Sequence, residues 1–198
     1  MKEYSKVQKM VGTAVLAAIV VVLQTVASGI HVGPFTITLS LVPIIIGAIM
    51  FGELSGAILG AVFGIVVATA VVLGADQGGA MMFSQNPFAT ILLCLLKSTV
   101  AGFVAGLISH KVASKNLMLG VILAAIAAPV CNTGIFVLGL STIFNDLLHT
   151  WAAGSGFGNA FVYIIVGLVG INFLIELLVD LILAPIIVSI VKTIRRAA

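Results

Sequence analysis

The chain has 198 residues, of which 62% are hydrophobic and 8% are charged, and its mean hydropathy is +1.34. A soluble domain carries about a quarter charged residues, so this composition predicts a protein of the lipid bilayer. The net charge of +3 forms no basic patch that would indicate a nucleic-acid partner. A spanning helix needs roughly 20 apolar residues, so the length allows about six spans and excludes a separate soluble domain.

The first apolar run follows Lys2, Lys6 and Lys9 and has some features of a signal peptide. It extends over residues 11–27, which is longer than a usual signal-peptide core, and the rest of the chain is equally apolar. We therefore interpret this run as the first membrane span.

Six helices fit the apolar runs, and the predicted fold is an all-α bundle of six transmembrane helices in a single domain, residues 1–198. The breaks between the runs contain Gly, Asn, Pro or charged residues, which interrupt periodic segments. Pro43, Pro129 and Pro185 fall inside predicted helices, where membrane packing tolerates a kink. The predicted helices cover residues 8–28, 37–52, 54–74, 88–110, 117–143 and 160–191.

The basic residues predict the orientation of the bundle. If the N-terminus is inside, six spans place eight of the nine Lys and Arg residues on the inner side, and the ninth, Lys97, lies within a span. The positive-inside rule therefore predicts that both termini are cytoplasmic. The last two outer loops are long for a compact protein, and two interpretations stay open: lids over a binding site, or connections anchored at the interface by Trp151.

Four glycines recur at every fourth position along the predicted third helix. Residues at this spacing share one helix face and form a smooth groove against which another helix can pack closely. We interpret this face as a packing surface, and not as a site, formed by Gly52, Gly56, Gly60 and Gly64.

Lys97 is the most informative polar residue within a span. It follows Phe88 by nine residues, so it lies roughly 14 Å below the outer surface. A lysine near the bilayer centre costs at least ~2.5 kcal/mol by insertion scales and usually faces a cavity or a partner. Two interpretations stay open: Lys97 meets a substrate, or it pairs with Glu176 or Asp180 of the last helix. Counting along that helix places both acids deeper, nearer the cytoplasm, where they would pair with each other or contact a cytoplasmic partner.

Two asparagines lie at nearly the same predicted depth as Lys97. Asn132 is roughly 17 Å and Asn172 roughly 18 Å from the outer ends of their helices. An amide in hydrocarbon needs hydrogen-bond partners, from a neighbouring helix or from a ligand. Hydrogen bonding between helices would explain each amide alone, but with Lys97 on a third helix they predict one polar pocket that opens outward.

Motifs for catalysis or metal binding do not stand out in the sequence. The histidines are scattered, and the Lys97-Ser98 pair lacks the glycines of a phosphate-binding loop. We therefore expect no catalytic residues, no metal, no cofactor and no ATPase motif. A small integral-membrane enzyme and a self-sufficient channel stay as alternatives. Uptake that persisted without partner subunits would favour the channel.

Several segments, in this order along the chain, resemble the substrate-binding (S) component of energy-coupling factor (ECF) vitamin transporters. The resemblance extends over nearly the whole chain, and its length and six predicted spans agree with that family. The segments are residues 14–18 (AVLAA), 35–38 (FTIT), 42–48 (VPIIIGA), the glycine-rich third helix, 86–88 (NPF) leading to Lys97, and 129–134 (PVCNTG).

The resemblance implies a multi-pass protein of a prokaryotic plasma membrane that binds a vitamin from outside. It also implies partners, namely an EcfT-like transmembrane coupling subunit and two cytoplasmic ATPase subunits. Ala14 and Ala18 would contact the coupling subunit. The vitamin would bind between the first outer loop and the outer halves of the last three helices. The candidate substrate-binding residues are Lys97, Asn132, Asn172, Phe35, Thr36, Asn86 and Trp151.

The identity of the vitamin depends chiefly on Lys97. A buried cation that faces the cavity favours an anionic ligand, which among the substrates of that family indicates pantothenate, biotin or folate over riboflavin. Few aromatic residues are available to stack on a large ring, because Trp151 is the only tryptophan and Tyr163 the only tyrosine in the predicted outer half. This shortage favours the small, flexible pantothenate as the first expectation.

Overall fold

The protein is an all-α bundle, as predicted, and the computed structural model describes residues 4–27, 31–32, 35–36, 38 and 40–197. Within this part, five helical segments are long and apolar enough to cross a membrane. Four are α1 (Lys6–Ala27), α3 (Glu53–Val72), α5 (Pro87–Ala113) and α6 (Leu117–Thr142). The fifth is built from α8 (Ala160–Val162), the π-helix η1 (Tyr163–Val169) and α9 (Gly170–Ala197). A shorter helix, α2 (Leu41–Phe51), completes the predicted six.

Each of the two long connections that the sequence predicts to be outer contains a short helix. These are α4 (Gln77–Gln85) and α7 (Asn145–Gly154). Asp76 begins α4 as an N-cap, because its carboxylate oxygen accepts a hydrogen bond of 2.7 Å from the Gly79 amide. The connection between α1 and α2, which the sequence predicts to be outer and which we call the first outer connection, contains two short antiparallel strands, β1 (His31–Val32) and β2 (Phe35–Thr36), in which His31 pairs with Thr36.

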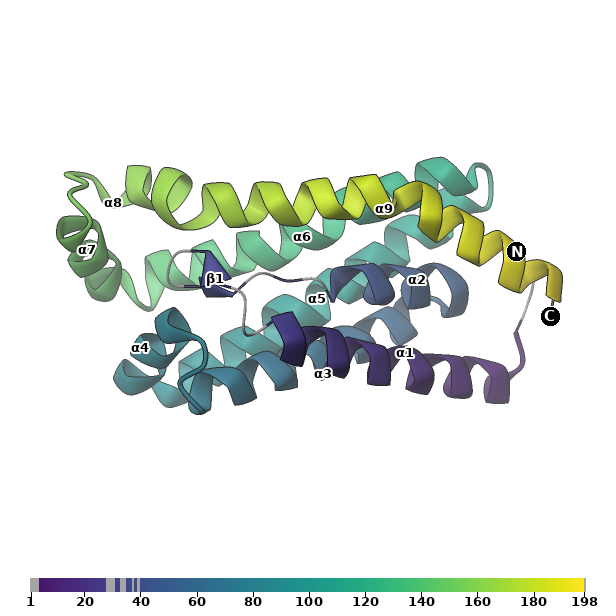
Figure 1. Cartoon of the computed structure of the whole chain (residues 1–198), viewed down its shortest axis with the longest axis horizontal. Coiled ribbons are helices and arrows are strands. Elements are labelled where there is room, and N and C mark those ends of the chain that lie inside the picture. Colours follow the sequence, from purple (N-terminus) through teal and green to yellow (C-terminus); the bar gives the residue numbers. More distant parts are fainter. Residues whose placement is uncertain (1–3, 28–30, 33–34, 37, 39, 198) are drawn as a thin grey trace.

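Different helices and turns lie at the two ends of the bundle (Figure 1). The start of α1, the α2–α3 turn and the end of α9 lie at one end, whereas α4, α7 and α8 lie at the other. Lys6, Lys9 and Lys192 therefore lie at the same end of the bundle. We refer to this end as the basic end and to the opposite one as the loop end.

The observed start of α2 corrects a prediction. The helix begins at Leu41, not at residue 37, and it is 11 residues long. Pro43 has no amide hydrogen and lies in the first turn of α2, where a backbone amide would have no partner within the helix. At 1.5 Å per residue α2 covers about 16 Å, so the connection before it reaches well into the bundle.

Small residues allow α3 and α5 to pack with their backbones in contact. A Cβ atom at Gly56 would collide with the Gly102 carbonyl oxygen, and a Cβ atom at Gly60 would collide with the Ser98 carbonyl oxygen. A Cβ atom at Gly64 would lie 2.8 Å from the Cys94 carbonyl oxygen. Gly52 has a different role. It forms the α2–α3 turn with a φ of 98°, a left-handed conformation that favours glycine.

Candidate functional site

Lys97 lies on α5 and is half-buried. Its ammonium Nζ lies 4.9 Å from the centre of the Phe136 ring on α6, a cation–π contact. The sequence did not single out Phe136, although it follows Asn132 by one helical turn and therefore shares its face of α6. This contact places the Lys97 ammonium at the α5–α6 interface.

Asn132 is buried on the same face of α6, with 4% of its surface exposed. Its amide oxygen has no hydrogen-bond partner among the residues that the structure describes. A buried carbonyl oxygen of this kind is costly unless a donor reaches it. Asn132 is therefore positioned to accept a hydrogen bond from a bound molecule.

Glu176 lies near the same polar region, so the interpretation in which Lys97 pairs with this acid stays open. Its carboxylate accepts a hydrogen bond from the Thr38 hydroxyl and interacts electrostatically with Lys97. Thr38 precedes α2, so this hydrogen bond joins the first outer connection to α9. Asn172 is partly buried one turn before Glu176. The site thus combines residues from α5, α6, α9 and the first outer connection.

Asp180 lies one further turn along α9 and interacts electrostatically with Glu176. Its side chain is 2% exposed, and its Oδ2 atom has no hydrogen-bond partner in the described part of the chain. Glu176 therefore interacts with Lys97 on one side and with Asp180 on the other, and Lys97 is not an isolated cation. If Lys97 forms an ion pair within the protein, Glu176 is therefore the candidate partner.

A second set of buried polar contacts holds the start of α2. The Ser40 hydroxyl donates a hydrogen bond of 3.0 Å to the Gln24 side-chain oxygen of α1. Gln24 is 1% exposed and Ser40 is fully buried. Together with the Thr38–Glu176 hydrogen bond, this contact attaches the end of the first outer connection to both α1 and α9.

The remaining candidate substrate residues lie further from this cluster or beyond the described residues. Asn86 is exposed and caps α5, since its side-chain oxygen accepts a hydrogen bond of 3.1 Å from the Ala89 amide. Trp151 lies on α7 and packs against the apolar cluster at the loop end. Phe35 and Thr36 form strand β2, and their side chains lie outside the described part of the chain.

The residues predicted to contact a coupling subunit lie on an open helix face. Ala14 and Ala18 are both exposed on α1, where only Thr13, Val20, Gln24 and Ala27 are buried. The exposed face of α1 is therefore apolar and uncovered in the single chain.

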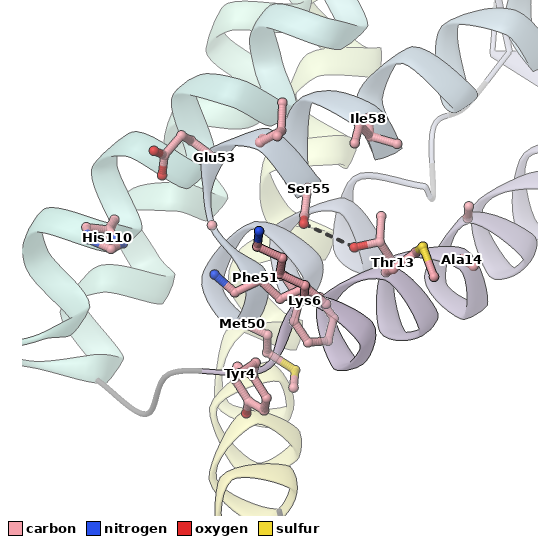
Figure 2. Close-up of a pocket in the computed structure, with 15 residues that line it drawn as sticks. Tyr4, Lys6, Thr13, Ala14, Met50, Phe51, Glu53, Ser55, Ile58 and His110 are labelled. Atoms are coloured by element: carbon pink, nitrogen blue, oxygen red, sulfur yellow. Dashed lines mark hydrogen bonds between the residues drawn. The ribbon is translucent and has the colours of Figure 1, made fainter.

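A groove of about 830 Å³ runs beside this face at the basic end (Figure 2). It separates α1 from the α2–α3 turn and the end of α5, and its charged and titratable lining residues include Lys6, Glu53 and His110. The Thr13 hydroxyl donates a hydrogen bond of 3.1 Å to Ser55 at the groove floor, which joins α1 to α3.

Comparisons with known proteins agree with this architecture. The fold matches the crystal structure described as native-SAD phasing for ThiT from Listeria monocytogenes, with a TM-score of 0.64 and 23% sequence identity over 95% of each chain. A search of curated proteins finds no match. The family "ECF transporter, substrate-specific component" matches residues 8–188. The chain therefore belongs to the family of substrate-specific components of ECF transporters, and it is a multi-pass transporter subunit of the membrane.

Proposed function

We propose that this subunit binds a small vitamin with a carboxylate group, pantothenate being the first candidate, in the polar region around Lys97. The observation that carries the proposal is the position of Lys97 beside Phe136. Phe136 lies one turn from Asn132, whose buried amide oxygen has no hydrogen-bond partner among the described residues. The Lys97 ammonium would bind the carboxylate of the ligand. The Asn132 amide oxygen would accept a hydrogen bond from a hydroxyl or amide group of the ligand.

Pantothenate satisfies both requirements, because it combines one carboxylate with two hydroxyl groups and one amide N–H. Biotin and folate also carry carboxylates and are the next candidates, whereas riboflavin offers hydroxyl groups without a carboxylate. Phe35, Thr36 and Asn172 would complete the site on the side of the first outer connection and of α9.

Glu176 and Asp180 support a second candidate of opposite charge. Both acids are buried and lie near Lys97 or near each other. If they determine the charge of the site, a cationic vitamin such as thiamine would bind in preference to a carboxylate. The charge of the ligand thus distinguishes the two candidates.

Delivery of the vitamin would require an EcfT-like coupling subunit and two ATPase subunits. Ala14 and Ala18 would contact the coupling subunit through the exposed face of α1. Uptake of the vitamin by cells that contain this subunit but no coupling module would contradict this part of the proposal.

The decisive experiment identifies the ligand and then removes the charge. The protein is purified from cells grown in rich medium, the bound molecule is identified by mass spectrometry, and affinities are measured for pantothenate, biotin, folate, riboflavin and thiamine. We expect Lys97→Met to weaken binding of the carboxylate vitamin about 30-fold or more, as for other buried charge pairs. Lys97→Ala should do the same. Lys111→Met, which removes an exposed lysine from the same helix, should leave affinity unchanged.

Two outcomes would overturn the proposed ligand. Full affinity of Lys97→Met for every carboxylate vitamin would show that the charge does not pair with the substrate. Tight binding of thiamine that is lost in Glu176→Gln would show that the acids select the ligand.

A further inference from the structure

Asp76 is a buried acid to which the site described above assigns no role. It lies between α3 and α4, and 6% of its surface is exposed. The hydrogen bond from the Gly79 amide satisfies part of its capacity, since a carboxylate has about four acceptor positions. A carboxylate this deeply buried is unfavourable unless other donors or a cation compensate its charge.

A small cavity of about 20 Å³ connects Asp76 with Lys97. Its polar lining consists of Asp76, Thr90, Cys94 and Lys97, and Phe136 lies on its apolar side. Asp76 and Lys97 both act electrostatically on the Cys94 thiol, which lines the same cavity. The Thr90 hydroxyl donates its hydrogen to the Asn86 carbonyl oxygen at 2.9 Å and keeps its acceptor positions.

These dimensions suit a single water molecule. A buried water needs roughly 10–15 Å³ and two to four polar partners. The cavity meets both conditions, because Lys97 can donate to the water, Asp76 can accept from it, and Thr90 can accept its second hydrogen.

We propose that Asp76 is a counter-ion of Lys97, joined to it by one water molecule in this cavity, and that it is a positioning residue that limits how strongly Lys97 attracts a ligand carboxylate. Lys97 then has acidic neighbours from two elements, Asp76 before α4 and Glu176 on α9. The ion pair is a property of the ligand-free protein, whereas the effect on ligand affinity rests on the proposed function.

A mechanical link follows from the position of Asp76. The same carboxylate caps α4 through Gly79 and faces Lys97 across the cavity. A ligand carboxylate that draws the Lys97 ammonium away would remove one of the groups that compensate the charge of Asp76. Ligand binding and the position of α4 at the loop end are thereby coupled.

The ligand-free pairing is tested with a double-mutant cycle of Asp76→Asn and Lys97→Met, measured as unfolding equilibrium constants in mixed micelles. Asparagine keeps the oxygen that caps α4 and removes only the charge. We expect a coupling of about tenfold or more, because one bridging water would hold the two charges about 5–6 Å apart, and unit charges at that separation attract each other at least this strongly at an effective dielectric constant of about 20. Asp146→Asn, an exposed acid on α7, serves as the matched control and should combine additively with Lys97→Met. Additivity within about twofold for Asp76→Asn would overturn the pairing.

The effect on ligand affinity is tested with pantothenate and with panthenol, in which an alcohol replaces the carboxylate. We expect Asp76→Asn to raise pantothenate affinity about tenfold and panthenol affinity less than about twofold, because only the carboxylate competes with Asp76 for Lys97. Equal changes for both ligands would overturn the positioning role. If the wild-type protein binds neither molecule, pantothenate as the substrate is refuted, and the unfolding cycle still decides whether Asp76 and Lys97 pair.

Discussion

Gly60→Ala tests whether close backbone contact between α3 and α5 stabilises the bundle. The added Cβ would collide with the Ser98 carbonyl oxygen and would also lie 2.9 Å from the Ser98 carbonyl carbon and 3.1 Å from the Thr99 Cα. All three atoms belong to the backbone of α5, so no rotamer change can relieve the collision. The two helices must separate along their contact.

The expected magnitude follows from two opposing effects. Overpacking a tight interior costs about 1–3 kcal/mol, whereas replacing glycine by alanine within a helix gains about 0.5–1 kcal/mol. Gly60→Ala should therefore lower the free energy of unfolding by about 1–2 kcal/mol. Gly64→Ala should have a smaller effect, because its Cβ would lie 2.8 Å from the Cys94 carbonyl oxygen, 0.6 Å short of the 3.4 Å of ordinary contact.

Gly134→Ala provides the matched control within a helix. No atom lies within 4 Å of a Cβ at this position among the described residues, so only the gain in helix propensity applies. Unfolding in mixed micelles, followed by far-UV circular dichroism, should order the variants from Gly60→Ala, least stable, through Gly64→Ala to Gly134→Ala. Equal stability of Gly60→Ala and Gly134→Ala would refute the packing argument.

Three further predictions concern contacts described above. Ala14→Leu with Ala18→Leu should leave vitamin affinity unchanged and abolish uptake in cells with the coupling module, because both residues are exposed on α1; a parallel loss of affinity would contradict this. Phe136→Leu should destabilise the protein by about 0.5–2 kcal/mol through loss of the cation–π contact, and this loss should shrink in a Lys97→Met background. Thr13→Val should cost about 1–2 kcal/mol of stability because it leaves the Ser55 hydroxyl unpaired, and adding Ser55→Ala should restore part of it. Thr69→Val is the control, because the Thr69 hydroxyl donates its hydrogen bond to the Ile65 carbonyl oxygen of the same helix.

Apolar runs and their interruptions predict most of the helices of this fold. Asn86, Asn116 and Asn159 mark helix starts, and each accepts the capping hydrogen bonds expected of asparagine at that position. The α4 and α7 helices were missed because they are short and less apolar, so hydropathy does not distinguish them from loops. Their formation depends on local capping at Asp76 and on packing of α7 against α6.

The site was predictable only in part. Lys97, Asn132 and Asn172 are polar residues in apolar helices, and this contrast alone identifies them. Glu176 was not among the predicted substrate-binding residues, because counting residues along one helix cannot reveal that Thr38 of a neighbouring connection meets it. Phe136 carries no sequence signal of its own, since a phenylalanine in a membrane helix is ordinary.

The brevity of α2 has a consequence for how the protein enters the membrane. Its 11 residues cover about half of a hydrocarbon core that is about 30 Å thick, and nine of them are buried against other helices. Such a segment presents little surface to lipid, so its partition into the bilayer depends on helices on either side. We expect α2 to become fixed only after α3 has been synthesised and the Gly52 turn has formed. Insertion of this half of the chain is therefore a cooperative step, whereas α5 and α6 are long enough to insert one at a time.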